Sequence, residues 1–125
     1  MLKWLLIAGG GGLGSVLRYA VQLAAARNCG TSFPLGTLLV NVTGCLVIGA
    51  LSSVFSNSNA IRPELRLALT VGVLGGFTTF STFGLESFEL LMERRVSTFL
   101  LYAASSVLLG VAAVWLGWRV GQAAG

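Results

Sequence analysis

The sequence predicts an all-α membrane protein with four transmembrane helices, on the grounds of its composition, its sparse charges and the length of its uncharged stretches. Of its 125 residues, 55% are apolar and 10% are charged, whereas about 25% of residues are charged in an average soluble domain. A soluble domain of this size would need a more polar surface. The composition therefore favours a chain that is surrounded by lipid.

Four stretches are apolar enough and long enough to cross a bilayer, whose hydrocarbon core of about 30 Å needs roughly 20 residues of helix. They lie at about 4–26, 35–55, 66–92 and 96–118, with a turn-rich loop expected from Asn57 to Pro63. We expect residues 1–125 to form a single four-helix transmembrane domain. The protein should therefore be a multi-pass membrane protein with the lipid bilayer as its environment.

The basic residues are evenly shared between the two sides of the predicted membrane domain. Both termini and the second loop share one side, which carries Lys3, Arg62, Arg66 and Arg119. The other side carries Arg27, Arg94 and Arg95, together with Arg18 if that residue lies near this end. Orientation normally follows an excess of Lys and Arg on the cytoplasmic side. The balance predicts that the chain inserts in both orientations.

Two broad function classes are poorly supported by the residues. The chain has no His and only two Cys, so it offers little from which to build a metal-dependent or nucleophilic active site. We therefore expect no enzymatic activity. The sequence pI of about 9.8 would suit nucleic-acid binding, but no basic face with interleaved aromatic residues accompanies it. Arginines at the membrane boundary explain the pI, and we expect no nucleic-acid partner.

The third stretch is expected to be broken near its middle. Residues 72–83 combine glycines with four hydroxyl residues at a depth where hydrocarbon should lie. Glycine weakens a helix, and Ser and Thr offer its backbone competing hydrogen bonds, so we predict a break from Gly75 to Thr79. A break at this depth survives only where protein encloses it or where it lines a cavity. Beyond it, Phe80 and Phe83 lie on nearly one face of the helix.

Two other stretches place polar groups inside the membrane, where they are costly and so are candidates for function. Asn41 lies on a small and polar face of the second stretch, and Tyr102 and Ser106 belong to a narrow polar strip on the fourth. Hydrogen bonding between helices would equally explain each of them. Together with the break and the two phenyl rings, they describe a narrow lining without fixed negative charge, which suits an anion better than a metal cation.

The chain resembles the Fluc (CrcB) family of fluoride channels. The resemblance lies in Gly-Thr-Leu-Leu-Val-Asn at 36–41, in Gly-Gly-Phe-Thr-Thr-Phe-Ser-Thr-Phe at 75–83 and in Gly-Ser-Val-Leu-Arg-Tyr at 14–19. It spans all four stretches. The family implies a fluoride-selective ion channel of the bacterial inner membrane, which exports fluoride passively and so lowers its cytoplasmic concentration.

The resemblance also implies an architecture and a set of site residues. Two copies would form an antiparallel, dual-topology homodimer with two fluoride pores. The residues assigned to each pore are Asn41, Phe80, Ser81, Thr82, Phe83, Tyr102 and Ser106. A structural sodium ion at the dimer interface would be held by the main-chain carbonyls of Gly75 and Thr78. The resemblance leaves the roles of Arg18 and Glu86 open.

Two other functions fit the size and composition less well. A small dual-topology multidrug exporter also has four helices, but it needs a glutamate embedded in its first helix, where this chain has Arg18. A structural subunit of a larger membrane complex would explain the glycine-rich helices. It would not explain the string from Gly75 to Phe83.

Overall fold

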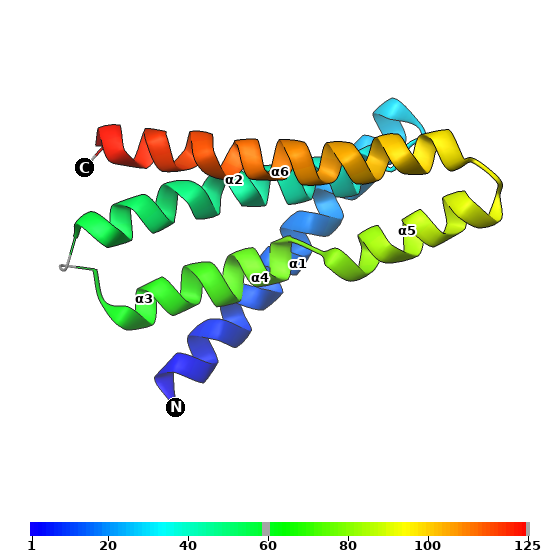
Figure 1. The fold of residues 1–125 in the computed structure, drawn as a ribbon. Coiled ribbons are helices and arrows are strands. Elements are labelled where there is room, and N and C mark those ends of the chain that lie inside the picture. Colours follow the sequence, from blue (N-terminus) through cyan, green and yellow to red (C-terminus); the bar gives the residue numbers. More distant parts are fainter. Residues whose placement is uncertain (59–60, 125) are drawn as a thin grey trace.

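Helices form almost all of the protein in the computed structural model, which describes residues 1–58 and 61–124 (Figure 1). The helical elements, in chain order, are α1 (Leu2–Cys29), α2 (Leu35–Asn57), α3 (Pro63–Leu67), the π-helical segment η1 (Ala68–Leu74), α4 (Gly75–Phe77), α5 (Phe80–Met92) and α6 (Val96–Ala124). Four spans are long and apolar enough to cross a membrane: α1, α2, the run Pro63–Met92 and α6. The predicted all-α class with four membrane-spanning helices is confirmed.

The helices are longer than the apolar stretches that predicted them. The third begins at Pro63 instead of 66, because proline has no N–H to lose at the first helical position and its fixed φ suits a helix. The fourth runs to Ala124 instead of 118, since a helix can continue into the polar zone beyond the hydrocarbon. Within the predicted loop from Asn57 to Pro63, both end residues are helical, and residues 59 and 60 lie outside the described residues.

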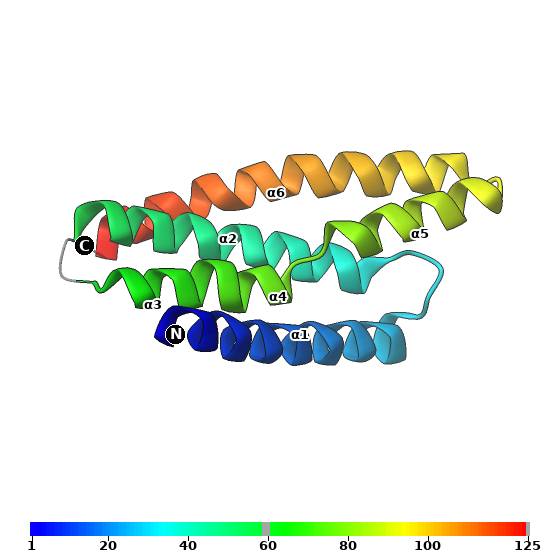
Figure 2. The same cartoon turned by 90° about the horizontal axis from the view of Figure 1, so that it is seen from below.

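The helices α2 and α6 run side by side in the same direction (Figures 1 and 2), and glycines bring their backbones together. A Cβ atom on Gly117 would lie 2.0 Å from the carbonyl oxygen of Leu46, and one on Gly49 would lie 2.2 Å from that of Val114. Such distances leave no room for a side chain. Gly117 and Gly49 thus allow the close approach that small residues give to transmembrane helices.

The helix α1 packs in the same way along η1 and α4 (Figure 2). A Cβ atom on Gly76 would lie 2.3 Å from the carbonyl oxygen of Gly11, and one on Gly14 would lie 2.1 Å from that of Val73. By contrast, nothing lies within 4 Å of the Cβ position of Gly9. Gly14 and Gly76 therefore serve close packing between the helices, whereas Gly9 does not.

The break in the third helix is shorter than predicted and comes later. The segment from Gly75 to Phe77 remains helical, and the extended residues are Thr78 and Thr79, where the ribbon thins between α4 and α5 (Figure 1). The reason is local packing, because close contact with α1 holds Gly76 in the helix. Upstream, η1 is π-helical over Ala68–Leu74, which the sequence analysis did not anticipate.

A small core lies where α2, α5 and α6 meet. Leu38, Leu90 and Tyr102 are buried there, and Phe33 and Phe83 pack against them. Many other apolar side chains point outward, as do those of Leu108 on α6 and Phe88 on α5. This distribution is expected of helices whose outer faces contact lipid.

The turn between α5 and α6 is closed by backbone hydrogen bonds. The amide of Arg94 donates to the carbonyl of Leu91 at 3.0 Å, and the amide of Arg95 donates to that of Leu90 at 2.8 Å. This pair is a Schellman motif, which needs a left-handed residue after the helix. Arg94 takes that position with a φ of 59°, although glycine would adopt it at lower energy.

We therefore expect Arg94→Gly to be more stable than Arg94→Ala by about 1 kcal/mol, because both lose the charge and only glycine relieves the left-handed strain. Thermal unfolding of the two variants in the same detergent measures the difference. Equal melting temperatures, or a lower value for the glycine variant, would show that the turn carries no strain.

Candidate functional site

The side chain of Asn41 on α2 stabilises the break in the third helix by taking the place of a backbone partner. Its Oδ1 accepts a hydrogen bond from the amide of Thr79 at 2.8 Å, and its Nδ2 donates to the carbonyl of the same residue at 3.0 Å. An amide nitrogen carries two hydrogens, so one N–H of Asn41 remains for a ligand. The role as a helix-to-helix bond and the role in a site are therefore compatible.

We call the two hydrogen bonds between Asn41 and Thr79 the Asn41 bracket. A cavity of about 420 Å³ lies beside it. Its lining includes Asn41, Gly44, Cys45, Ile48, Thr70, Leu74, Gly75, Thr78, Thr79, Phe80, Phe83, Ser106 and Val107. We call it the Asn41 cavity. Among the described residues that line it, none carries a charge. It brings together four of the seven predicted pore residues, namely Asn41, Phe80, Phe83 and Ser106.

The two phenylalanines lie side by side at the start of α5. Their ring centroids are 5.6 Å apart, and the ring of Phe80 is 83% exposed. Phe83 also contacts the ring of Tyr102, with centroids 5.1 Å apart. On α6, the hydroxyl oxygen of Ser106 is buried and has no hydrogen-bond partner among the described residues. The cavity thus has aromatic edges on one wall and an unpaired hydroxyl on another.

The three remaining predicted residues do not line the Asn41 cavity. Tyr102 is fully buried, and its hydroxyl donates to Glu86 Oε2 at 2.6 Å. Thr82 lines a second cavity, while Ser81 is exposed and its hydroxyl lies 3.4 Å from that of Thr79. Ser106 lines the Asn41 cavity, whereas Tyr102 lies in the buried core and contacts Glu86.

The second cavity, of about 430 Å³, lies between α1, α2 and α5. Its lining includes Gln22, Thr37, Thr82, Glu86, Glu89, Glu93 and Arg95, and we call it the Glu86 cavity. Thr79, which lines the first cavity, donates through its hydroxyl to that of Thr82 at 2.9 Å. This pair of hydroxyls lies between the two cavities at the first turn of α5.

A hydrogen-bonded chain that the sequence analysis did not assign lies at the inner end of the Glu86 cavity. Gln22 Nε2 donates to Thr37 Oγ1 at 3.1 Å, and Thr37 Oγ1 donates to Glu86 Oε1 at 2.8 Å. Glu86 therefore accepts from Thr37 and Tyr102 with its two oxygens. An ionisable residue inside a span is a functional candidate, and this signal could have indicated Glu86, three residues after Phe83 on the same helical face.

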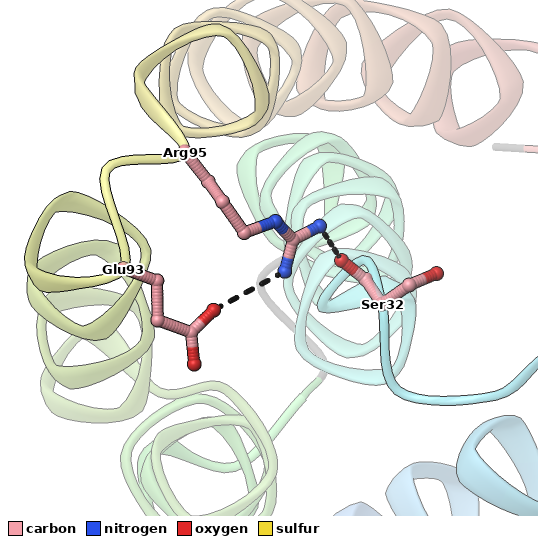
Figure 3. Close-up of polar contacts among 3 residues, drawn as sticks. All are labelled: Ser32, Glu93 and Arg95. Carbon is pink, nitrogen blue, oxygen red and sulfur yellow. Dashed lines mark hydrogen bonds and ion pairs between the residues drawn. The ribbon is translucent and has the colours of Figure 1, made fainter.

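Arg95 lines the loop end of the Glu86 cavity. Its Nη1 lies 3.5 Å from Glu93 Oε2, and its Nη2 donates to the main-chain carbonyl of Ser32. Figure 3 shows the guanidinium lying between the turn after α5 and the loop before α2. The contact fixes these two loops relative to each other.

The main chain at the break supplies free carbonyl groups, as a cation site would require. The amide of Thr79 would close the next helical turn on the carbonyl of Gly75, but it donates to Asn41 instead. The carbonyl of Thr78 receives only a long contact of 3.4 Å from Arg18 Nη1, and a carbonyl oxygen has two lone pairs. Neutral carbonyls of this kind suit a monovalent hard cation better than a divalent one.

Comparison with known proteins identifies the family of this chain. The family described as CrcB-like protein, Camphor Resistance (CrcB), matches residues 5–118. The chain belongs to the CrcB family. Proteins named Fluoride-specific ion channel FluC resemble this member over nearly its whole length. The one from Methylobacterium nodulans is 50% identical over 91% of each chain.

Further relatives of the same name are also similar over nearly the whole chain. The protein from Phocaeicola vulgatus is 46% identical over 94% of this chain and 96% of its own. The protein from Acidobacterium capsulatum is 42% identical over 97% of each. The predicted family is confirmed, and so is the expectation that this CrcB protein is not an enzyme, because these relatives are named as ion channels.

Proposed function

We propose that this CrcB protein is a fluoride channel of a bacterial inner membrane, which lets fluoride leave the cell down its electrochemical gradient. The observation that carries the proposal is the Asn41 bracket at the helix break, which leaves one amide N–H of a residue that lines a cavity of uncharged residues. The names of its relatives support fluoride as the ion. Passive flow needs no energy source.

The lining can replace part of the water that fluoride loses on entering. Hydrogen-bond donors compensate a dehydrated anion, and here they come from Asn41 and from the hydroxyls of Ser106 and the Thr79–Thr82 pair. Phenyl rings carry a positive edge that attracts anions weakly. Several weak sites in series allow the ion to leave as well as to bind, and the donors of the Asn41 cavity together with the Thr79–Thr82 pair would provide such a series.

Growth in fluoride tests this function in cells. A bacterium that lacks its own fluoride exporter should grow at millimolar fluoride when this chain is expressed, and growth in chloride should not change. An expressed chain that gives no protection would contradict the proposed export. A chain that protects against a cationic drug but not against fluoride would favour the exporter alternative, which the positive charge of Arg18 on α1 argues against.

The phenyl rings give a more specific prediction. We expect Phe80→Ile and Phe83→Ile each to slow fluoride flux about 10-fold, because the bulk is largely kept and the positive ring edge is lost. Phe88→Ile on the same helix is the matched control, since Phe88 is 59% exposed and lines neither cavity. Ion-electrode recordings of purified variants measure the rates. Wild-type rates for both Phe80→Ile and Phe83→Ile would remove the rings from the mechanism.

We also propose that two copies form an antiparallel homodimer from chains inserted in opposite orientations. The exposed residue Phe80, which lines the Asn41 cavity, supports a second copy there. The near balance of basic residues supports both orientations. Arg18 contacts the break at Thr78, so it does not lie at a helix end. Without it, four basic residues lie on one side of the membrane domain and three on the other.

Dual insertion predicts that a tag on the C-terminus is accessible from both sides of the membrane in one cell population. Lysines added to the loop between α1 and α2 should bias insertion toward one side. Flux should then fall unless an oppositely biased chain is co-expressed. Labelling of the tag on one side only, in the unmodified chain, would contradict dual insertion.

Sodium is the cofactor that the free carbonyls at the break would suit. The carbonyls of Gly75 and Thr78 would hold it, and the bound ion would supply a fixed positive charge in a region of low dielectric, where it favours anions nearby. Purified protein in which a large organic cation replaces sodium should lose dimer stability. A dimer that is unaffected by this replacement would exclude a structural sodium site.

A further inference from the structure

Gln22 connects the first helix to the Glu86 cavity through a hydrogen bond whose direction is fixed by its partners. A carboxylate is only an acceptor, so the single hydroxyl hydrogen of Thr37 must point to Glu86 Oε1. Thr37 can then only accept from Gln22, which agrees with the contact to Nε2 at 3.1 Å. The amide of Gln22 therefore occupies the acceptor side of the Thr37 hydroxyl and helps to hold that oxygen beside Glu86.

The close packing of α1 against α2 brings Gln22 within this distance. A Cβ atom on Gly36 would lie 3.0 Å from the Cα of Gln22 and 3.4 Å from its Cγ. Any side chain at position 36 would push the two helices apart by a few tenths of an ångström. The neighbouring residue is Thr37, which is 1% exposed, so the hydrogen bond and the helix spacing depend on the same contact.

We propose that Gln22 is a positioning residue of the fluoride pathway, acting through Thr37 to hold the Glu86 carboxylate in place. The proposal rests on the proposed function. Glu86 lines the same cavity as Thr82, whose hydroxyl accepts a hydrogen bond from Thr79 beside the Asn41 cavity. With its two oxygens held by Thr37 and Tyr102, the carboxylate cannot swing into the space that an anion must cross. Without Gln22, the Thr37 hydroxyl keeps only its hydrogen bond to Glu86 and holds the carboxylate less firmly.

Fluoride flux gives the first test. Gln22→Leu, which keeps the size and removes the donor, should slow flux roughly 3- to 10-fold, the factor that one neutral hydrogen bond represents. Gly36→Ala should slow it comparably, because it moves Gln22 away. Gln122→Leu is the matched control, since Gln122 is exposed near the end of α6. Wild-type flux in Gln22→Leu would overturn the proposal.

A double-mutant cycle distinguishes action through Thr37 from a general loss of packing. Thr37→Val removes the hydroxyl and keeps the shape. If Gln22 acts through this hydroxyl, Gln22→Leu combined with Thr37→Val should be no slower than Thr37→Val alone. Independent effects that multiply would overturn the proposed route through Thr37.

An infrared measurement makes the proposal testable even if the protein conducts no fluoride. The four acidic residues of the chain are all glutamates, so the difference between wild type and Glu86→Gln isolates the carboxylate stretch of Glu86. Gln22→Leu and Gly36→Ala should shift this band, and Gln122→Leu should not. An unshifted band in Gln22→Leu would overturn the positioning role, whereas absent flux in the wild type would overturn only the proposed function.

Discussion

Replacing Asn41 with aspartate is expected to abolish fluoride flux, with a loss of more than about 100-fold. The substitution is nearly isosteric, but an ionised carboxylate cannot donate to the carbonyl of Thr79, from which the amide nitrogen lies 3.0 Å away. It also places a negative charge on the lining of an otherwise uncharged cavity. Repulsion at about 4 Å amounts to roughly 4 kcal/mol at an effective dielectric of 20, which alone corresponds to nearly a thousand-fold in rate.

Asn57→Asp is the control for this prediction, because Asn57 lies on the same helix, is exposed at its C-terminal end and lines neither cavity. It should conduct like the wild type. Both variants are compared by fluoride efflux from liposomes after their dimer content has been checked. Unchanged flux in Asn41→Asp would restrict Asn41 to packing the helix break.

The largest expected loss of stability comes from Gly117→Ala. The added Cβ atom would lie 2.0 Å from the carbonyl oxygen of Leu46 and 2.9 Å from the amide nitrogen of Ala50. Both atoms belong to the backbone of α2, so neither can rotate aside. Separating α2 from α6 loses the packing between them, and we expect a cost of about 3 kcal/mol, at the upper end for overpacked interiors.

Gly9→Ala provides the matched control, because nothing lies within 4 Å of the Cβ position of Gly9 in α1. Alanine is the better helix former by about 1 kcal/mol, so this variant should be as stable as the wild type or more so. Thermal unfolding in detergent compares the two. Equal melting temperatures for Gly117→Ala and the wild type would contradict the tight α2–α6 interface.

Most of the fold could be predicted from the sequence because hydropathy reports directly on lipid contact. The starts of α2 and α6 at Leu35 and Val96 agree with the predicted 35 and 96. In the sequence, Pro34 marks the start of α2, and the paired arginines 94–95 mark the start of α6. The start of the third helix and the end of the fourth were missed. A helix does not end where hydrocarbon ends, and only backbone hydrogen bonding decides its last turn.

The site could be predicted only in part, for a related reason. Asn41 and the break were indicated because polar groups and glycines at mid-span are costly. The extent of the break could not be predicted, because it depends on the contact of Gly76 with α1 and on the hydrogen bonds between Asn41 and Thr79. The contacts that join Gln22, Thr37 and Glu86 link three helices, and no spacing along one chain reveals which faces meet.

The most direct test of the central claim is an efflux measurement on purified protein in liposomes, with fluoride, chloride and a cationic drug compared in parallel. We expect rapid fluoride release that depends on Asn41, with chloride release at the level of protein-free liposomes and no movement of the drug. Equal release of fluoride and chloride would contradict fluoride selectivity. Fluoride release no faster than from protein-free liposomes would contradict the channel itself.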